Sequence, residues 1–447
     1  MEVAVIGAGY VGLTTAACLA SHENSVTCID TDGARVAALN AGRMPIYEPG
    51  LDVVIEKAAK AGRLRFTTDV ATNVRSADIV FLAVGTPSAA DGGVDLSQIE
   101  AAAASIGPHL KSRAVVVIKS TVPPGTAQRV SAILQTRASA DGVTVVSNPE
   151  FLREGSALKD CQHPDRIVIG SFDDHGAAMM RKLYSPFGAR NVPFVMTTPA
   201  NAELIKYAAN AFLAMKIGFI NDIADLCEKI GGDVGDVARG IGLDARIGTA
   251  FLQAGPGYGG SCFPKDTRGL AHAGKAHGAP QPLVELVIER NENRMRKIAR
   301  RVLDALRIKD SESTARRQAR VAIFGLAFKP ETDDMRDAPS LTVISMLQKE
   351  GVTVSAHDPH AMANARALLD DVELCTCPYE AAKDADAIVL LTEWSSFRAL
   401  DIGRLAGTMR GQSFFDYRNA FKPNEILAHG LDYFGVGRPA QVHAPAE

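Results

Sequence analysis

Short apolar runs alternate with longer segments of helical spacing over about the first 169 residues of this 447-residue chain. The runs are rich in valine and isoleucine and contain few polar residues, which is typical of parallel strands buried on both faces. They read EVAVIG, SVTCID, DIVFLAV, AVVVIKS, VTVVSN and RIVIG. The pattern predicts a Rossmann-like, doubly wound α/β domain, to which we assign residues 1–198.

The strand pattern stops near Pro199, where helical spacing takes over. Small and apolar side chains occupy nearly every side of the long helix that begins there, which is typical of a helix buried by several neighbours. We therefore expect a central helical domain over residues 199–308. We also expect its long connecting helix to join two copies of the chain in a homodimer.

Beyond this domain, residues 309–320 are polar and charged without periodicity, and we interpret them as a linker or an exposed excursion. The runs VAIFGLAF, VTVSAHDP, ADAIVLLTEW and SFFDYRN then repeat the strand and helix alternation. This repetition predicts a second Rossmann-like α/β domain at residues 318–435. Residues 436–447 are predicted to be a disordered tail.

Composition narrows the classes of function. A formal net charge of −3 offers no general attraction to nucleic acid or to an anionic membrane, and no apolar run approaches the length that spans a bilayer. The seven cysteines form no CxxC pair, so we expect reduced thiols and no metal site. With a strand and turn at its very start instead of a signal peptide, the chain is expected to be cytoplasmic.

A GxGxxG motif, Gly7, Gly9 and Gly12, stands between the first predicted strand and a helix. Such glycines allow a tight turn and a close approach of the backbone to a pyrophosphate at the helix N-terminus. Asp30 ends the second strand at the distance expected for the acid that accepts ribose hydroxyls, and Asp32 would repel a 2′-phosphate. These residues favour NAD over NADP; the alternative is a glycine turn with a structural role only.

Polar residues follow several of the predicted strands. Thr86 and Thr121 are expected at the carboxyl edge of the sheet, where ligands bind in such folds, although either threonine alone would be an ordinary turn residue. Glu150 and Glu154, with Arg153 between them, follow VTVVSN. The two carboxylates are candidate general bases; the alternative is a solvated charged turn.

Three residues of the central segment are candidates for covalent chemistry. Lys206 and Asn210 share a face of the long helix and could stabilise an oxyanion, unless Lys206 extends to solvent. Cys262 follows the glycine-rich run GPGYGG and precedes a segment of helical composition. A thiol at a helix N-terminus is a candidate nucleophile; the alternative is a small buried apolar side chain.

The last domain opens with FGLAFKPETDDMRDAPS, in which a strand and a glycine turn precede Lys329 and Arg336. The two cations would suit phosphate groups. Because the segment lacks a complete GxGxxG, we expect it to bind a nucleotide diphosphate and not a second dinucleotide.

Taken in order, GAGYVG, KSTVPPGT, NPEFLREG, GPGYGGSCFPKD and the opening of the last domain resemble the UDP-glucose/GDP-mannose dehydrogenase family over about residues 1–435. The resemblance implies that the C6 alcohol of a sugar nucleotide is oxidised to a carboxylate with two NAD, through a thiohemiacetal and a thioester on Cys262. The lead-in GPGYGGSCF favours UDP-glucose. The alternatives are GDP-mannose, a UDP-N-acetylhexosamine, or an inactive NAD-binding sensor or scaffold.

The resemblance also implies roles for individual residues. Lys206 and Asn210 would stabilise oxyanions at C6, and Asp266 with Thr121 would hold the water that releases the acid. Contacts with the substrate are implied for Glu150, Phe151, Leu152, Arg153, Glu154, Lys206, Asn210, Arg246, Phe251, Leu252, Gln253, Ala254, Gly255, Tyr258, Gly259 and Lys329.

Two of these implied roles carry a further qualification. Glu150 would be the base for thioester hydrolysis and Glu154 would assist, but the resemblance leaves their division of labour open. Arg246 would reach the substrate across a dimer interface.

Contacts with NAD are implied for Gly7, Gly9, Tyr10, Val11, Gly12, Asp30, Arg35, Thr86, Thr121, Glu154, Lys265 and Arg336. The family usually has lysine at the position of Arg35, and arginine keeps the charge there with a different geometry.

Overall fold

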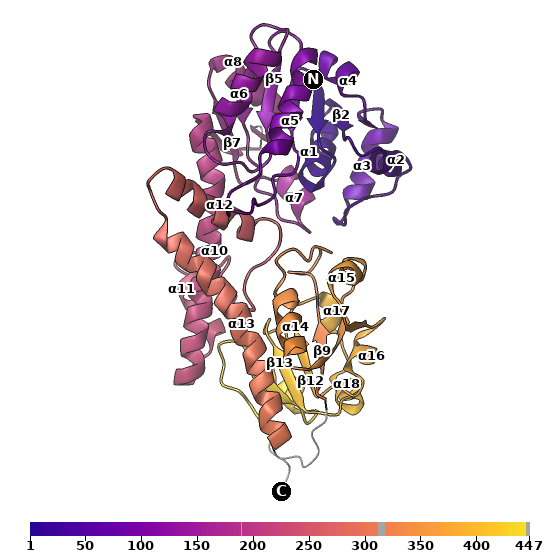
Figure 1. Ribbon diagram of the computed structural model, residues 1–447, viewed down its shortest axis with the longest axis vertical. Coiled ribbons are helices and arrows are strands. Elements are labelled where there is room, and N and C mark those ends of the chain that lie inside the picture. The colour runs from indigo at the N-terminus through magenta and orange to yellow at the C-terminus, as the bar shows by residue number, and fades with distance from the viewer. Residues whose placement is uncertain (189, 312–317, 444–447) are drawn as a thin grey trace. The chain divides into compact units, whose positions relative to one another are not determined.

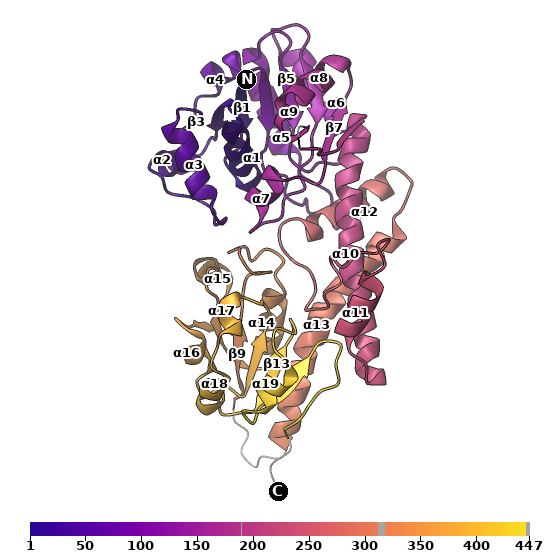
Figure 2. The same ribbon diagram turned by 180° about the vertical axis from the view of Figure 1, so that it is seen from behind.

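The computed structural model describes residues 1–188, 190–311 and 318–443 of the chain. It comprises two compact units, one of Met1–Ala209 with Arg268–Pro280 and one of Asn210–Thr267 with Gln281–Glu447. Each unit contains one sheet with helices packed on it (Figures 1 and 2). The predicted fold class, an α/β protein with two Rossmann-like sheets, is confirmed.

The first unit is built on an eight-stranded sheet in the order β3-β2-β1-β4-β5-β6-β7-β8. Neighbouring strands are parallel except β6 and β7. The strand predicted from RIVIG, β7, and its parallel neighbour β8 therefore run opposite to the other six strands, because β7 returns beside its predecessor without a crossover. The strands are β1 (Glu2–Ile6), β2 (Ser25–Ile29), β3 (Leu64–Thr67), β4 (Ile79–Leu82), β5 (Val115–Ile118), β6 (Thr144–Ser147), β7 (Ile167–Ser171) and β8 (Phe194–Thr197).

Helices cover both faces of this sheet, so its strands need apolar side chains on both sides. Along β1, Val3 and Val5 pack into one hydrophobic cluster together with side chains of α1. Ala4 and Ile6 pack into another cluster with side chains of α5 and α6. The helices are α1 (Tyr10–Ser21), α2 (Gly33–Asn40), α3 (Leu51–Lys60), α4 (Val70–Ser76), α5 (Ser97–Ile106), α6 (Thr126–Arg137), α7 (Ala157–Gln162), α8 (Asp174–Leu183) and α9 (Ser185–Gly188).

The long predicted helix of the central segment is α10 (Pro199–Ile230), which starts in the first unit and ends in the second. Two further helices of the second unit are α11 (Val234–Gly242) and α13 (Pro282–Ser311), while α12 (Phe263–Ala276) leads back to the first unit. Within the described ranges, no helix has the length and apolarity needed to cross a membrane.

The second unit also contains a six-stranded parallel sheet in the order β11-β10-β9-β12-β13-β14. The strands are β9 (Arg320–Phe324), β10 (Thr353–His357), β11 (Val372–Leu374), β12 (Ala387–Leu390), β13 (Ser413–Asp416) and β14 (Asp432–Gly435). The helices that accompany them are α14 (Pro339–Lys349), α15 (Met362–Leu368), α16 (Pro378–Ala382), α17 (Ser395–Arg398), α18 (Ile402–Thr408) and α19 (Pro423–Leu427).

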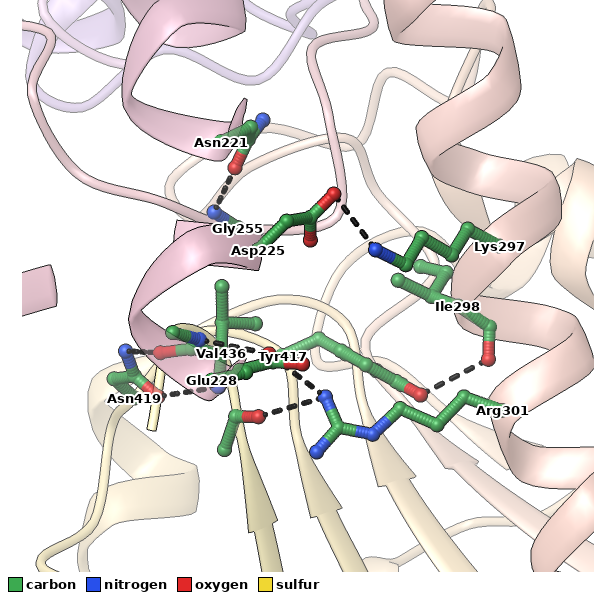
Figure 3. Close-up of polar contacts among 12 residues, drawn as sticks. Asn221, Asp225, Glu228, Gly255, Lys297, Ile298, Arg301, Tyr417, Asn419 and Val436 are labelled. Atoms are coloured by element: carbon green, nitrogen blue, oxygen red, sulfur yellow. Dashed lines mark hydrogen bonds and ion pairs between the residues drawn. The ribbon is translucent and has the colours of Figure 1, made fainter. Parts of the chain in front are cut away.

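Polar contacts fasten this sheet to α10 and α13 (Figure 3). The buried Tyr417 hydroxyl donates to the carbonyl oxygen of Ile298 on α13 at 2.9 Å. Arg301 bonds both Glu228 on α10, at 3.0 Å, and the carbonyl oxygen of Gly435, at 3.1 Å. Within the second unit, α13 and the part of α10 that belongs to this unit therefore pack on the sheet.

The predicted linker and tail have more structure than their polarity indicates. Residues 309–311 complete α13 and Arg320 begins β9, while 312–317 lie outside the described residues. In the segment predicted to be a disordered tail, Val436 is buried and Gln441 pairs with Tyr433. Residues 436–443 therefore extend the packing of β14, because their backbone groups find partners there; residues 444–447 lie outside the described residues.

Candidate active site

The glycine turn after β1 combines two packed glycines with an open one. Gly7 has φ +104°, and a Cβ there would lie 2.6 Å from the carbonyl oxygen of Ala83. A Cβ at Gly12 would lie 1.9 Å from the oxygen of Gly7, whereas one at Gly9 would meet nothing within 4 Å. The turn thus leaves space at the N-terminus of α1, where backbone amides and the helix dipole favour a phosphate. Val11 is half-buried against the core cluster.

Asp30, at the end of β2, is a buried carboxylate beside this turn. It accepts hydrogen bonds from the backbone N–H groups of Ala8, at 2.7 Å, and Asp32, at 2.9 Å, and from Arg35, at 3.0 Å. Burial opposes the charge, but the donors prevail and lower the pKa of Asp30. Open space at Gly9 and an ionised acid at the adjacent strand end fit the phosphates and ribose of a dinucleotide.

Tyr10, the first residue of α1, is tied to the loop that follows Glu154. Its hydroxyl donates to Glu48, and both oxygens accept from the backbone N–H of Gly155, at 2.9 and 2.7 Å respectively. Glu48 also accepts from the N–H of Leu158 at 3.1 Å. Burial, followed by the interaction with Glu48, raises the pKa of Tyr10. No sequence motif drew attention to Glu48; its role depends on these long-range contacts.

The structure brings Thr86 and Thr121 together at one edge of the first sheet. Thr86 is buried and its hydroxyl donates to the carbonyl oxygen of Thr121 at 3.0 Å. The two strand ends that carry them, those of β4 and β5, are neighbours in the sheet. Thr86 therefore acts on the position of Thr121 through the backbone.

Glu150 and Lys206 form a buried ion pair in the first unit. Their side chains are 5% and 3% exposed, and the carboxylate and ammonium groups are 3.1 Å apart. Glu150 also accepts from the backbone N–H of Leu152. Two cations lie over the Phe151 ring, with Lys206 Nζ 5.4 Å and Arg166 Cζ 3.7 Å from its centroid. Because burying two charges carries a large desolvation cost, such a pair is weak evidence for stability.

Three arginines that sequence analysis assigned to ligands each pair with a nearby aspartate. All three are solvent-exposed, with side chains between 60% and 88% exposed. The pairs are Arg153 with Asp160, Arg246 with Asp244, and Arg336 with Asp334. Each arginine would have to exchange its carboxylate for the ligand, and exposed ion pairs of this kind are weak enough to permit it.

Cys262 stands directly before α12 in the second unit. Its carbonyl oxygen accepts the first turn's hydrogen bond from Asp266 N–H at 2.8 Å, and its Sγ lies 3.4 Å from the Ser261 hydroxyl. The thiol is half-buried at the positive end of a helix dipole, which favours a thiolate. In the part of the chain that the structure describes, no group of three or more His, Cys, Asp or Glu side chains could hold a metal ion.

Asp266 joins two other predicted site residues in the second unit. It is 1% exposed and accepts from the Asn210 amide at 2.6 Å and from the Lys265 ammonium at 2.6 Å. Both carboxylate oxygens are engaged, which fixes the orientation of the Asn210 side chain. Residues 56 positions apart in the sequence are thus held in one polar cluster.

The glycine-rich loop ahead of Cys262 is held by Asn291, a buried residue of α13. Asn291 accepts from the backbone N–H of Tyr258 at 2.8 Å and donates to the carbonyl oxygen of Tyr258 at 2.9 Å. Gly257 has φ +110°, and a Cβ there would lie 2.7 Å from Asn291 Oδ1. This two-way clamp therefore requires glycine at position 257.

Gly255 is held in a similar way, and Figure 3 shows its contact with Asn221. Its N–H donates to Asn221 on α10 at 2.8 Å, and its carbonyl oxygen accepts from Arg294 on α13 at 3.0 Å. Sequence analysis missed Asn221, Asn291 and Arg294. Buried polar residues within long helices were the available signal, because such groups must find partners.

The end of the same loop packs on the segment that opens the last domain. A Cβ at Gly259 would lie 2.3 Å from the carbonyl oxygen of Asp337, and one at Gly260 would lie 2.7 Å from the Phe328 ring. The Gly260 N–H donates to the carbonyl oxygen of Arg336 at 2.8 Å. The glycine-rich loop and the segment that opens the last domain are therefore neighbours in the second unit, although they lie far apart in the sequence. Lys329 belongs to this segment, with its ammonium 5.5 Å from the centroid of the Phe328 ring.

Residues 251–254 divide between support and exposure. Leu252 and Ala254 belong to the hydrophobic core of the second unit. Phe251 has φ +63° and contacts the ring of Phe263, while Gln253 is exposed. Any ligand contact of Leu252 and Ala254 would therefore use their backbone groups.

Comparison with known proteins assigns the chain to a family. The model of the NAD binding domain of the UDP-glucose/GDP-mannose dehydrogenase family matches residues 1–188. The models of the central domain and of the UDP binding domain of the same family match residues 200–293 and 322–423.

Individual relatives cover almost the whole chain. A UDP-glucose 6-dehydrogenase of Rhizobium meliloti is 50% identical over 442 residues, which cover 98% of this chain and 100% of the relative. One of Pseudomonas aeruginosa is 45% identical, with 100% and 99% covered. The solved UDP-glucose dehydrogenase of Pyrobaculum islandicum has a TM-score of 0.89 at 38% identity, with 98% and 97% covered. The chain therefore belongs to the UDP-glucose/GDP-mannose dehydrogenase family.

Proposed function

We propose that this chain is a UDP-glucose 6-dehydrogenase, which oxidises the C6 alcohol of UDP-glucose to the carboxylate of UDP-glucuronate. Curated relatives of that activity are 45–50% identical to it over nearly the full length. The structural observation that carries the proposal is the polar cluster around Asp266, which stands one helical turn after a half-buried thiol, Cys262.

NAD is the cofactor of this reaction, since the first 188 residues match the family's NAD binding domain. Gly9 and the N-terminus of α1 would hold its pyrophosphate, and Asp30 would hold a ribose. When bound, NAD supplies the hydride acceptor for each of the two oxidations.

Cys262 would keep the intermediate on the enzyme. The first oxidation leaves an aldehyde at C6, and the Cys262 thiolate attacks its carbon to form a C–S bond and an oxyanion. The second oxidation turns this thiohemiacetal into a thioester. Water then attacks the carbonyl carbon, the C–S bond breaks, and the carboxylate leaves with the thiol restored.

The polar groups would divide the remaining work. The Lys206 ammonium and the Asn210 amide would stabilise the oxyanions at C6, as preorganised donors do. Asp266 and Thr121 would hold the hydrolytic water. We assign Glu150 as the base because its carboxylate lies 3.1 Å from the ammonium of Lys206, the group that would stabilise the oxyanion.

The second half of the chain would bind the nucleotide end of the substrate. Residues 322–423 match the family's UDP binding domain. Lys329 and the backbone of residues 251–259 are our candidates for the diphosphate and sugar contacts. We retain 1–198, 199–308 and 318–435 as the proposed cofactor, central and UDP-sugar domains.

The deciding experiment counts NADH formed per UDP-glucose consumed. A ratio of about two, with UDP-glucuronate as product, is required by a four-electron oxidation. Cys262→Ser should abolish steady formation of the acid, whereas Cys377→Ser, a matched half-buried cysteine, should leave it intact. Activity with GDP-mannose or a UDP-N-acetylhexosamine but not with UDP-glucose would overturn the proposed substrate. The absence of activity with any sugar nucleotide would overturn the proposal that the chain is an enzyme.

We also propose a homodimer formed through α10. Four large apolar residues at heptad-like spacing on this helix are between 52% and 70% exposed, which is unusual unless a partner covers them. They are Phe212, Phe219, Leu226 and Ile230. Phe219→Asp should therefore halve the mass measured by light scattering, and an unchanged mass would refute this interface.

We place the enzyme in the cytoplasm, where NAD and its seven thiols would be available in the required forms. Arg246, which is 88% exposed, would in the proposed dimer be able to reach the partner's substrate. Arg246→Ala should then raise the KM for UDP-glucose without changing that for NAD. If wild type and Arg246→Ala have the same KM for UDP-glucose, Arg246 does not belong to the substrate site.

A further inference from the structure

Glu203 is a buried carboxylate of the first unit that the proposed reaction does not use. It lies on α10, one turn before Lys206, and is 3% exposed. One oxygen accepts from the backbone N–H of Gly125 at 2.8 Å. The other accepts from the N–H of Ala127 and the hydroxyl of Ser147, both at 2.9 Å.

The partners of Glu203 lie on the segments that carry the proposed chemistry. Gly125 and Ala127 stand at the start of α6, four to six residues after Thr121. Ser147 is the last residue of β6, three residues before Glu150. Together with its own helix, which carries Lys206, the carboxylate therefore joins three segments that are distant in the sequence.

A small pocket of about 10 Å³ lies where these segments meet. Its lining includes Thr121, Ser147, Glu203 and Lys206. The anchor and two of the groups that it joins thus face the same space.

Burial and hydrogen bonding have opposite effects on the pKa of Glu203. Burial raises the pKa of Glu203 to about 7, although the hydrogen bonds from Gly125, Ser147 and Ala127 lower it. Lys206 and Glu150 form their own ion pair nearby. The buried Lys119 donates to Asn148, the residue after Ser147, at 3.0 Å.

We infer that Glu203 is a positioning residue for the oxidation, whose carboxylate sets the relative positions of Thr121, Glu150 and Lys206. Because these three groups have their roles only under the proposed function, the role of Glu203 rests on that function as well. The competing explanation is a helix cap that contributes to stability alone.

Glu203→Gln tests the inference because it keeps the shape but presents an amide N–H₂ to groups that donate. We expect kcat to fall about 100-fold, the effect of displacing reacting groups by about 1 Å, while both KM values stay within about threefold. Glu203→Asp keeps the charge and should recover part of kcat. Ser147→Ala should lower kcat less, and its effect should largely vanish in the Glu203→Gln background.

Asp173→Asn is the matched control. Asp173 caps α8 by accepting the N–H of Gly176 at 2.7 Å, and α8 carries none of the three groups. It should lower the thermal midpoint without changing kcat at temperatures where the enzyme is folded. If Glu203→Gln behaves like Asp173→Asn, Glu203 is a cap and the inference is wrong.

Amide hydrogen exchange supplies a readout that does not depend on activity. Glu203→Gln should speed exchange in residues 120–127 and 148–153, and Asp173→Asn should not. If wild-type enzyme oxidises no sugar nucleotide, the proposed function fails, while exchange still decides whether Glu203 anchors these segments. Unchanged exchange in a folded variant would overturn the anchor, and if Glu203→Gln does not fold, Glu203→Asp and Ser147→Ala decide it.

Discussion

The two sheets of this protein begin with the same arrangement of a glycine turn and an aspartate, but the aspartates have different roles. In each, the first strand ends at a glycine of positive φ, Gly7 at +104° and Gly325 at +91°. In each, the next strand along the chain is followed by an aspartate, Asp30 or Asp358. Both sheets also share the strand order 3-2-1-4-5-6 over their corresponding strands.

The difference lies in how much of the aspartate is already occupied. Asp30 accepts two backbone N–H groups and an arginine. Asp358 is 1% exposed and accepts five donors. They are the N–H groups of Leu326, Ala327, His360 and Ala361 and the indole N–H of Trp394.

A carboxylate has about four lone-pair sites, so Asp358 has no capacity left for ribose hydroxyls. The second sheet keeps the frame of a dinucleotide site but uses its acid to hold its own turn. This agrees with the match of residues 1–188 to an NAD binding domain and of residues 322–423 to a UDP binding domain. Strand order and a glycine turn are therefore insufficient to identify a dinucleotide site.

The largest effect should come from Gly325→Ala. A Cβ there would lie 2.4 Å from Cβ of Thr392 in a backbone conformation that suits glycine. We expect a loss of about 3 kcal/mol or more in the free energy of unfolding, measured by urea denaturation. Gly351→Ala, with φ +79° and nothing within 4 Å, isolates the backbone cost and should lose about 1 kcal/mol.

Gly9→Val should weaken binding of the cofactor and have little effect on the stability of the fold. Its Cβ meets no protein atom within 4 Å, and Gly9 has an extended backbone at φ −81°. Calorimetric titration should show NAD binding weakened about 100-fold, which is about 2.7 kcal/mol, with less than about 1 kcal/mol lost in stability. Gly407→Val, also in open space, should leave NAD binding unchanged.

Asp358→Asn and Asp30→Asn should separate the two acids. Asp358→Asn places an amide N–H₂ among five donors and should cost about 2 kcal/mol of stability. Asp30→Asn should cost about half as much but weaken NAD binding. If the two variants lose equal stability and NAD binding is unaffected, the contrast between the sheets is incorrect.

The smallest effect concerns pH, and it has opposite signs at two strand ends. The donors around Asp30 lower its pKa on folding, so its contribution is present above the usual aspartate pKa of about 3.9 and is lost as pH falls through the folded value. Burial raises the pKa of Asp416, at the end of β13, so its contribution falls as pH rises from about 3.9 towards the folded value.

Unfolding measured between about pH 3 and pH 7 against Asp30→Asn and Asp416→Asn would test this. The advantage of wild type over Asp30→Asn should grow with pH. Its advantage over Asp416→Asn should shrink over the same range. Parallel trends would contradict the assignment of opposite shifts.

The inner strands could be predicted from sequence because they are buried on both faces and therefore consist of apolar runs, as in VVVI of β5. The outermost strands could not, because their apolar runs are short or interrupted by polar residues. Strands β3, β8, β11 and β14, with sequences such as LRFT and VEL, were not predicted. Their pairing is decided by a neighbouring strand that offers open hydrogen-bonding groups.

The sequence by itself determined the local motifs of the site. They are the glycine turn with Asp30, the cysteine loop, and the long helix with Lys206 and Asn210. These depend on local backbone freedom and on helical periodicity, which a short window of residues carries. Only the tertiary structure decided which polar groups hold them. Glu203 and Asn291 owe their roles to partners more than 30 residues away, because hydrogen bonds act over a few ångströms in space regardless of separation along the chain.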